Sequence, residues 1–257
     1  MSLPTPTRVL GFVFFLLGPA GVLAQDSTNG TFAARAEKAF VLAQKEFAQH
    51  PEQAGAACQL GRASYDLSEQ ATNMAQRAEV ARAGIASCRQ LLERDPKSAL
   101  GHYYLGMDYG ELAEAEAPSM AAYKLIREIE SEFKTTLELD ERLDFAGPPR
   151  CLGLLYRDAP GWPISIGSKH KAREYLERAA ALAPNFPENQ MNLFESCVGW
   201  HDLAGAETAW QNLAAIWPAA RTNLAGVVWE QTWNDWETRR EAAKADFEKA
   251  FKHPPGP

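Results

Sequence analysis

The feature that most constrains the fold of this 257-residue chain is a spacing of small and large residues that recurs in its second half. Small residues let two helices approach closely, large ones fill the space toward the next pair of helices, and a proline ends the second helix. One stretch carries Leu152, Gly153, Tyr156, Ala172, Leu176, Ala179 and Pro184. The next carries Leu193, Cys197, Ala206, Trp210, Leu213 and Pro218. The two stretches have the same spacing apart from an insertion in the earlier one, at Asp158–Ser168. This spacing predicts stacked hairpins, each with a helix A and a helix B.

Two earlier hairpins fit the same spacing more loosely. The first runs from Glu52 to Pro96 with Leu60-Gly61 in helix A, and the second from Ser98 to Asp140 with Leu105-Gly106 in helix A. Extra polar, alanine-rich residues at 68–81 are expected to lengthen the helices of the first hairpin. Residues 52–220 are therefore expected to form about four helical hairpins.

Helices are also expected at both ends of this array. Thr31 can cap a helix over Phe32–Gln49, since a threonine oxygen accepts a hydrogen bond from a free N–H of the first turn. A charged helix is expected to begin at Trp233 or Asn234 and to end at Lys252, giving the polar outer face that helical arrays need. We expect an all-α solenoid with an N-terminal segment and capping helix (25–51), hairpins (52–220), and a C-terminal capping helix and tail (221–257).

Residues 1–24 have the pattern of a signal peptide. Arg8 precedes the apolar run Val9–Leu17, and Val22-Leu23-Ala24 forms a small-residue cleavage site. The apolar run is shorter than the ~20 residues that span a bilayer. We therefore expect an exported chain, periplasmic or secreted after cleavage near Ala24, with no transmembrane segment in the mature chain.

The charge and the cysteines limit the partners and suggest covalent cross-links. A formal net charge of −7 argues against nucleic acid, which requires clustered Lys and Arg. Four cysteines in an exported chain are typical of disulfides, although four buried thiols are the alternative. Within one hairpin the positions of Cys58 and Cys88 face each other, which predicts that bond and leaves Cys151–Cys197 as a possible pair.

Residues Leu152-Gly153 to Pro184, continuing from Leu193 to Pro218, make the chain resemble the tetratricopeptide-repeat superfamily. That resemblance implies a non-enzymatic scaffold that presents a concave helical face to a protein or peptide. The long helices, the Pro-Gly loop before Lys169 and the exported context also look like the periplasmic T components of TRAP transporters. This narrower resemblance implies an apolar central channel for a small apolar or acidic solute, but the chain lacks a lipid-attachment cysteine and has only one such loop.

In the repeat register, helix A residues of each hairpin line the concave face. These positions hold Gln59, Arg62, Tyr65 and Asp66, then Tyr103, Tyr104, Met107 and Glu111, then Arg150, Leu154, Arg157 and Asp158, then Met191, Asn192 and Glu195. Aromatic, Met and Arg side chains are enriched at recognition surfaces, and the arginines can pair with carboxylates of a peptide or small acid. The alternative is that these aromatics belong to the core.

The insertion and the missing motifs complete the expectations. Trp162, in the Pro160–Pro163 segment, is interpreted either as a ligand lid or partner contact, or as a plug folded against the hairpin end. The sequence has no H-E-x-x-H, no Cys-x-x-Cys, no phosphate-binding glycine loop and no G-x-S-x-G. We expect neither a cofactor nor a metal site, and no enzymatic activity.

Overall fold

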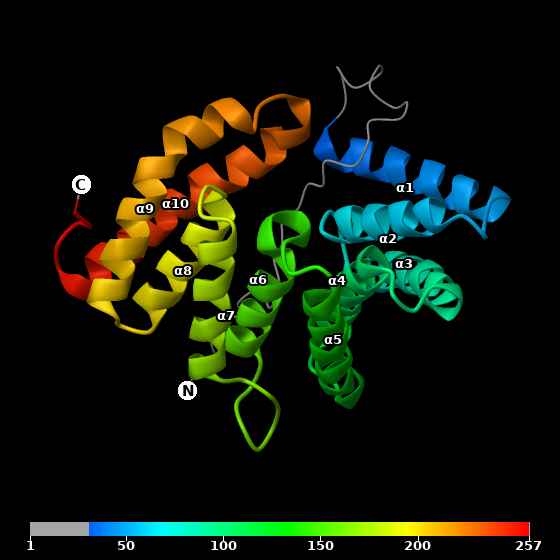
Figure 1. Ribbon diagram of the computed structural model, residues 1–257, viewed down its shortest axis with the longest axis horizontal. Helices are drawn as coiled ribbons and strands as arrows, with labels where there is room; N and C mark the ends of the chain where they lie inside the picture. The colour runs from blue at the N-terminus through cyan, green and yellow to red at the C-terminus, as the bar shows by residue number, and fades with distance from the viewer. Residues whose placement is uncertain (1–30, 257) are drawn as a thin grey trace. The chain divides into compact units, whose positions relative to one another are not determined.

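The elements of the chain are helices, as the computed structural model in Figure 1 shows for residues 31–256, the part that it describes. The predicted signal peptide lies outside the described residues. The helices are α1 (Phe32–Gln49), α2 (Ala54–Ser68), α3 (Met74–Arg94), α4 (Ala99–Ala115), α5 (Met120–Leu139), α6 (Leu143–Asp158), α7 (Lys169–Leu182), α8 (Pro187–Gly199), α9 (Leu203–Asn223), the 3₁₀ turn η1 (Val227–Trp229) and α10 (Glu230–Phe251). The all-α fold class is confirmed.

The described chain divides into two compact units. Residues 31–141 and 158–167 form the first unit, and residues 142–157 and 168–256 form the second. The predicted domain boundaries at residues 51 and 220 stay a prediction.

The first unit contains two hairpins, α2 with α3 and α4 with α5, and α1 packs on α2 (Figure 1). Helix α1 begins and ends where the sequence predicts, with the Thr31 hydroxyl accepting from the N–H of Ala34. Asn73, Ser98 and Ser119 cap α3, α4 and α5 in the same way. The glycines of the repeat pattern permit close helix contact: a Cβ on Gly106 would lie 2.8 Å from the Phe133 ring.

The second unit is built around aromatic residues. Helices α7, α9 and α10 all pack against α8. Phe186, Phe194, Trp210, Trp229, Trp233, Trp236 and Phe247 are buried in its core. The Trp233 and Trp236 rings meet edge to face, with centroids 4.9 Å apart. The expectation that the late tryptophans pack the last hairpin against the terminal helix is confirmed.

Two helix ends differ from the prediction. Pro218 does not end helix B of the fourth hairpin, because α9 continues through it to Asn223. A proline removes one helical hydrogen bond, and here it lies at an exposed position where water can reach the freed carbonyl. Helix α10 starts at Glu230, before the predicted Trp233 or Asn234, because the turn η1 leads directly into it.

Neither expected disulfide is formed in the structure, where all four cysteines are thiols. Burial raises the pKa of the Cys58 and Cys197 thiols to about 11. Cys88 and Cys151 are fully buried and serve as small core residues. Among the described helices, none is both long and apolar enough to cross a membrane.

Candidate functional site

The second unit begins with a left-handed turn. Asp144, Phe145 and Ala146, at the start of α6, have φ angles of 51°, 53° and 64°. A left-handed residue other than glycine costs roughly 1–2 kcal/mol, so three in a row require strong support from their surroundings. The right-handed part of α6 follows, with Pro148 and Pro149 in its first turn, where missing N–H groups cost no helical hydrogen bond.

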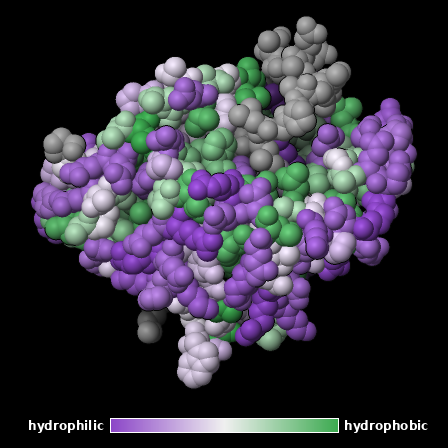
Figure 2. Space-filling model, in the orientation of Figure 1, coloured by the Kyte–Doolittle hydropathy of each residue, from purple (hydrophilic) through white to green (hydrophobic). Residues whose placement is uncertain are grey.

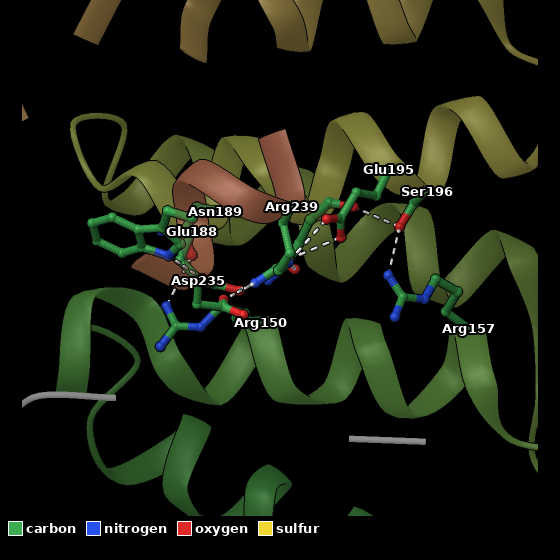
Figure 3. Close-up of polar contacts among 10 residues, drawn as sticks. Arg150, Arg157, Glu188, Asn189, Glu195, Ser196, Asp235 and Arg239 are labelled. Carbon is green, nitrogen blue, oxygen red and sulfur yellow. Dashed lines mark hydrogen bonds and ion pairs between the residues drawn. The ribbon is translucent and has the colours of Figure 1, made fainter. Parts of the chain in front are cut away.

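Arg150 supplies much of that support. Its Nη1 donates to the Phe145 carbonyl at 3.0 Å and to Asn189 Oδ1 at 2.9 Å. Its Nη2 donates to the Asp144 carbonyl at 3.1 Å and to the Asp144 carboxylate at 3.0 Å. The Arg150 side chain is fully buried. It therefore holds the turn in place. Figure 3 draws the Arg150 side chain beside that of Asn189.

Asn189, in the first turn of α8, supports the same turn from the other side. Its Nδ2 lies 3.0 Å from the Phe145 carbonyl, 3.1 Å from that of Ala179 and 3.2 Å from that of Ala183. These bonds tie the left-handed turn to α8 and to the end of α7. They satisfy carbonyl oxygens that would otherwise be costly to bury.

A second polar network joins α8 to α10 through Arg239 (Figure 3). Its guanidinium donates to Glu188 at 2.8 Å, to Asn192 at 2.7 Å and to Glu195 at 2.9 Å. Trp236 Nε1 also donates to the buried Glu188 carboxylate. Burial alone would raise the Glu188 pKa, but the charge and hydrogen bonds of Arg239 hold it below its usual value. Asn192 and Glu195, predicted to bind a ligand, are thus engaged within the chain.

The other predicted binding residues occupy varied environments. Tyr103, Tyr104 and Met107 are buried in α4, and Leu154 and Met191 are buried in the second unit. Arg157 is partly buried and donates to Ser196 at 3.3 Å. A role of these residues in binding stays a prediction. Over residues 31–256, no three His, Cys, Asp or Glu side chains gather in a way that could hold a metal ion.

Trp162 is the predicted binding residue that is most open to solvent, with 89% of its surface exposed. Figure 1 shows its segment as a long loop connecting α6 to α7. The loop is closed at its base, where the Gly167 N–H donates to the Pro160 carbonyl at 2.9 Å. A Cβ on Gly167 would lie 2.0 Å from the Ala159 carbonyl oxygen, so only glycine fits there. Trp162 is therefore displayed at the loop tip, and the interpretation of it as a plug is wrong.

The left-handed turn has a second consequence, because it places Phe145 at the wall of an apolar hollow. The Phe145 ring stacks on the Phe186 ring with centroids 4.3 Å apart. The guanidinium carbon of Arg150 lies 5.3 Å from the centroid of the Phe186 ring. The hollow has a volume of about 450 Å³. It is lined by Phe145, Ala183, Pro184, Asn185, Phe186, Ala215, Ile216, Ala219, Ala220, Asn223 and Leu224.

A shallower depression of about 340 Å³ adjoins this hollow and shares Pro184, Asn185, Ala215 and Ile216 with it. We call the two together the α9 trough. Gln190 lines the depression and is only 4% exposed. Its Nε2 donates to the Pro184 carbonyl at 3.5 Å, which leaves its Oε1 as an acceptor without a hydrogen-bond donor. A buried acceptor of this kind is uncommon and calls for an explanation.

Sequence reasoning did not find Phe145, Gln190 or Arg239. The alanines Ala215 and Ala219, four apart on exposed α9 positions, were a usable signal, because small side chains on one helix face leave room above it. The sequence around Arg239 has acidic residues on both sides and does not indicate which helix they face.

The comparisons with known proteins bear on the fold. No protein-family model matches the chain, and no curated protein matches its sequence. One solved structure that does match is a thermophilic tetratricopeptide-repeat protein from Thermus thermophilus, with a TM-score of 0.61 and 18% identity. The match covers 82% of this chain and 91% of the other. Nothing in these comparisons supports the narrower resemblance to TRAP-transporter components. With ten α-helices in hairpin order over residues 31–256, the chain has a tetratricopeptide-repeat-like α-solenoid fold.

Proposed function

We propose that this chain is an exported, non-enzymatic scaffold that binds protein partners, and that the loop over residues 158–168 makes the contact. The observation that carries the proposal is the exposure of Trp162 on a loop whose base is closed by hydrogen bonds. Tryptophan is the residue type most enriched among the anchors of protein interfaces. A loop that is ordered before binding loses little conformational entropy when it docks.

The surroundings of Trp162 support a protein contact. Ile164, two residues later, is 68% exposed. Residues 159–167 contain no charged side chain, although 23% of the chain is charged. The face drawn in Figure 2 is largely hydrophilic, with hydrophobic side chains scattered between. An uncharged aromatic tip on such a protein is suited to an apolar site on another protein.

The polar clusters support a scaffold over an enzyme. Arg150 and Asn189 are occupied by backbone carbonyls of the left-handed turn. Arg239, Glu188 and Glu195 bind one another between α8 and α10. Each cluster is thus accounted for by the fold that it stabilises. Export is supported by the signal-peptide pattern of residues 1–24.

A photo-crosslinking residue in place of Trp162 tests this function in the cells that make the protein. We expect protein adducts at position 162, identified by mass spectrometry, that a crosslinker at the partly exposed Leu42 of α1 does not give. Adduct yields at position 162 no higher than at position 42 would refute docking through the loop.

A further inference from the structure

After α10 the chain turns back onto the second unit (Figure 1). We call residues 253–256 the returning segment. Two contacts mark its course. The His253 ring meets the ring of Phe247, in α10, edge to face with centroids 5.5 Å apart. At the other end, a Cβ on Gly256 would lie 3.8 Å from Nε2 of Gln211, in α9. The returning segment therefore runs from α10 to α9.

Pro255 lies between these two contacts and is buried, whereas its neighbour Pro254 is exposed. Proline has no N–H, so a buried proline leaves no unpaired backbone donor. A proline also fixes its own φ at about −65° and holds the residue before it in an extended conformation. The returning segment thus has the polyproline II form in which proline-rich ligands bind to aromatic grooves.

The surface under the returning segment borders the aromatic core of the second unit. Phe247 belongs to that core, and its ring centroid lies 4.7 Å from that of Phe251. Gln211 directly follows the core residue Trp210 in α9. The guanidinium carbon of Arg240, in α10, lies 5.0 Å from the centroid of the Trp210 ring, so side chains of the two helices pack together. An aromatic surface between two helices is suited to a proline-rich chain.

Packing alone holds the returning segment in place. Within the described part of the chain, no hydrogen bond joins residues 253–256 to any other residue. Nδ1 of His253 donates to the Pro254 carbonyl at 2.8 Å, a bond inside the segment. One buried proline and one ring contact can be lost without unfolding the helices, since a weakly packed chain end opens at low free energy. The surface underneath is therefore accessible to a competing ligand.

We propose that the surface under the returning segment binds proline-rich segments of partner proteins, and that the returning segment covers this surface until such a ligand displaces it. The buried Pro255 identifies the class of ligand, because a proline already occupies the surface. This surface belongs to α9 and α10 of the second unit, so it is distinct from the loop of the proposed function.

Titration of the full chain into fluorescein-labelled decaproline, followed by fluorescence anisotropy, tests the inference. Pro255→Asp places a charge where the proline is buried, so it should release the returning segment. Decaproline should then bind ~10-fold or more tightly than to the wild type, because competition within the chain is removed. Pro254→Asp adds the same charge at the exposed neighbouring position, and it is the matched control that should bind like the wild type. Equal affinities of the two variants would overturn the proposal.

Pro255→Ala removes the proline ring without adding a charge, so it tests the same release where aspartate disturbs α10. It should strengthen decaproline binding ~3-fold, because the segment then covers the surface for less of the time. Urea unfolding followed by tryptophan fluorescence checks that the variant is folded. A folded Pro255→Ala protein that binds decaproline no more tightly than the wild type would equally refute the displacement.

A substitution under the returning segment locates the site. In the Pro255→Asp protein, Gln211→Ala should weaken decaproline binding ~3-fold or more, because Gln211 lies next to Gly256. Asn234→Ala, at an exposed position near the start of α10, should leave the affinity unchanged. If the two substitutions have the same effect, decaproline binds elsewhere and the site is wrong.

Two further probes define the ligand. A free peptide with the sequence of residues 252–257 should also bind the Pro255→Asp protein, and a glycine–serine peptide of equal length should not. If the 252–257 peptide binds and decaproline does not, the surface accepts only the chain's own segment, which excludes a partner. A wild-type dimer in sedimentation velocity that Pro255→Asp abolishes would show exchange of the segment between two copies, and would likewise exclude a partner.

Trp162→Ser separates this surface from the loop of the proposed function. In the Pro255→Asp protein it should leave decaproline binding unchanged, because Trp162 belongs to the first unit. Absence of crosslinks at position 162 would refute the loop contact and leave the decaproline result standing. Absence of decaproline binding would refute the proline-rich ligand and leave the loop contact standing.

Discussion

Two carboxyl groups, Asp108 in the first unit and Glu188 in the second, are buried to nearly the same extent and meet opposite surroundings. Glu188 receives hydrogen bonds from Arg239 and Trp236. Neither oxygen of Asp108 has a hydrogen-bond partner. Its carboxyl group lies against α3, where a Cβ on Gly84 would be 2.1 Å from Oδ2.

The ionisation of the two groups follows from their donors. Burial raises the pKa of Asp108 well above its usual value, and the negative charge of Asp66 raises it further. The Glu188 pKa is lowered, because Arg239 outweighs the effect of burial. We therefore expect Asp108 to be neutral between tightly packed helices and Glu188 to be an anion that ties α8 to α10. Two equally buried carboxyl groups thus differ in charge, because only Glu188 receives hydrogen bonds from neighbouring donors.

The largest effect is expected from Arg239→Met. The substitution leaves Glu188 and Glu195 without their cation, and breaking a buried pair from one side costs roughly 3–5 kcal/mol. Urea unfolding followed by tryptophan fluorescence measures this loss in the free energy of unfolding, because the buried tryptophans lie in the second unit. Lys249→Met, at an exposed position of the same helix, is the control and should change stability little. Equal losses for both variants would show that the network contributes nothing specific.

A smaller loss is expected from Glu188→Gln, which keeps the shape but removes the charge. Hydrogen bonds to a charged group contribute about 1.5–3 kcal/mol. Since the folded pKa of Glu188 is lowered, its contribution is present above the unfolded pKa of about 4.3 and is lost as pH falls through the folded pKa. The difference between wild type and variant should be constant from pH 5 to 8 and should shrink in more acidic solution. A difference that persists unchanged at low pH would contradict an ionised Glu188.

The elements that the sequence predicts well are those with local signals. Thr31 caps α1 as expected, because an N-cap depends on neighbouring N–H groups alone. The repeat spacing of small residues also predicts the hairpin order. The sequence does not decide whether Trp162 is exposed, because the direction of a loop depends on hydrogen bonds at its base, such as that from Gly167 to Pro160.

The rest depends on contacts that a pattern cannot show. The left-handed turn holds no glycine, since its residues are Asp144, Phe145 and Ala146, so nothing in the local sequence indicates it. Arg150 and Asn189, which come later in the sequence, stabilise the turn. The repeat register placed Arg150 on a recognition face, but the register does not reveal that its donors are used by the turn. The register likewise places Asn192 and Glu195 on that face but does not reveal that Arg239, more than forty residues later in the sequence, binds them.

Asp108→Asn tests whether Asp108, the other carboxyl group of the comparison, is neutral. We expect the variant to be more stable than the wild type by on the order of 1 kcal/mol at pH 7. The folded state holds a proton on Asp108 that the unfolded chain releases above its pKa of about 3.9, so wild-type stability falls as pH rises from there. Asparagine is neutral throughout and lacks this slope, although its own unmet hydrogen bonds offset part of the gain. Urea unfolding by circular dichroism between pH 4 and 8 measures the trend. If the stability of the wild type relative to the variant does not fall between pH 4 and 8, Asp108 is ionised in the folded state and the expectation is wrong.

The smallest effect concerns Asp66, the neighbour that helps to raise the Asp108 pKa. Burial raises the pKa of Asp66 to about 6, with Arg62 partly opposing it. Because Asp108 stays neutral over the range where Asp66 titrates, Asp108→Asn should leave the Asp66 midpoint near 6, as measured by carboxyl-detected NMR. Removing an ionised neighbour would instead lower that midpoint, since a nearby negative charge disfavours a second one. A fall of the Asp66 midpoint in the variant would therefore show that Asp108 carries a charge, and the contrast with Glu188 would no longer hold.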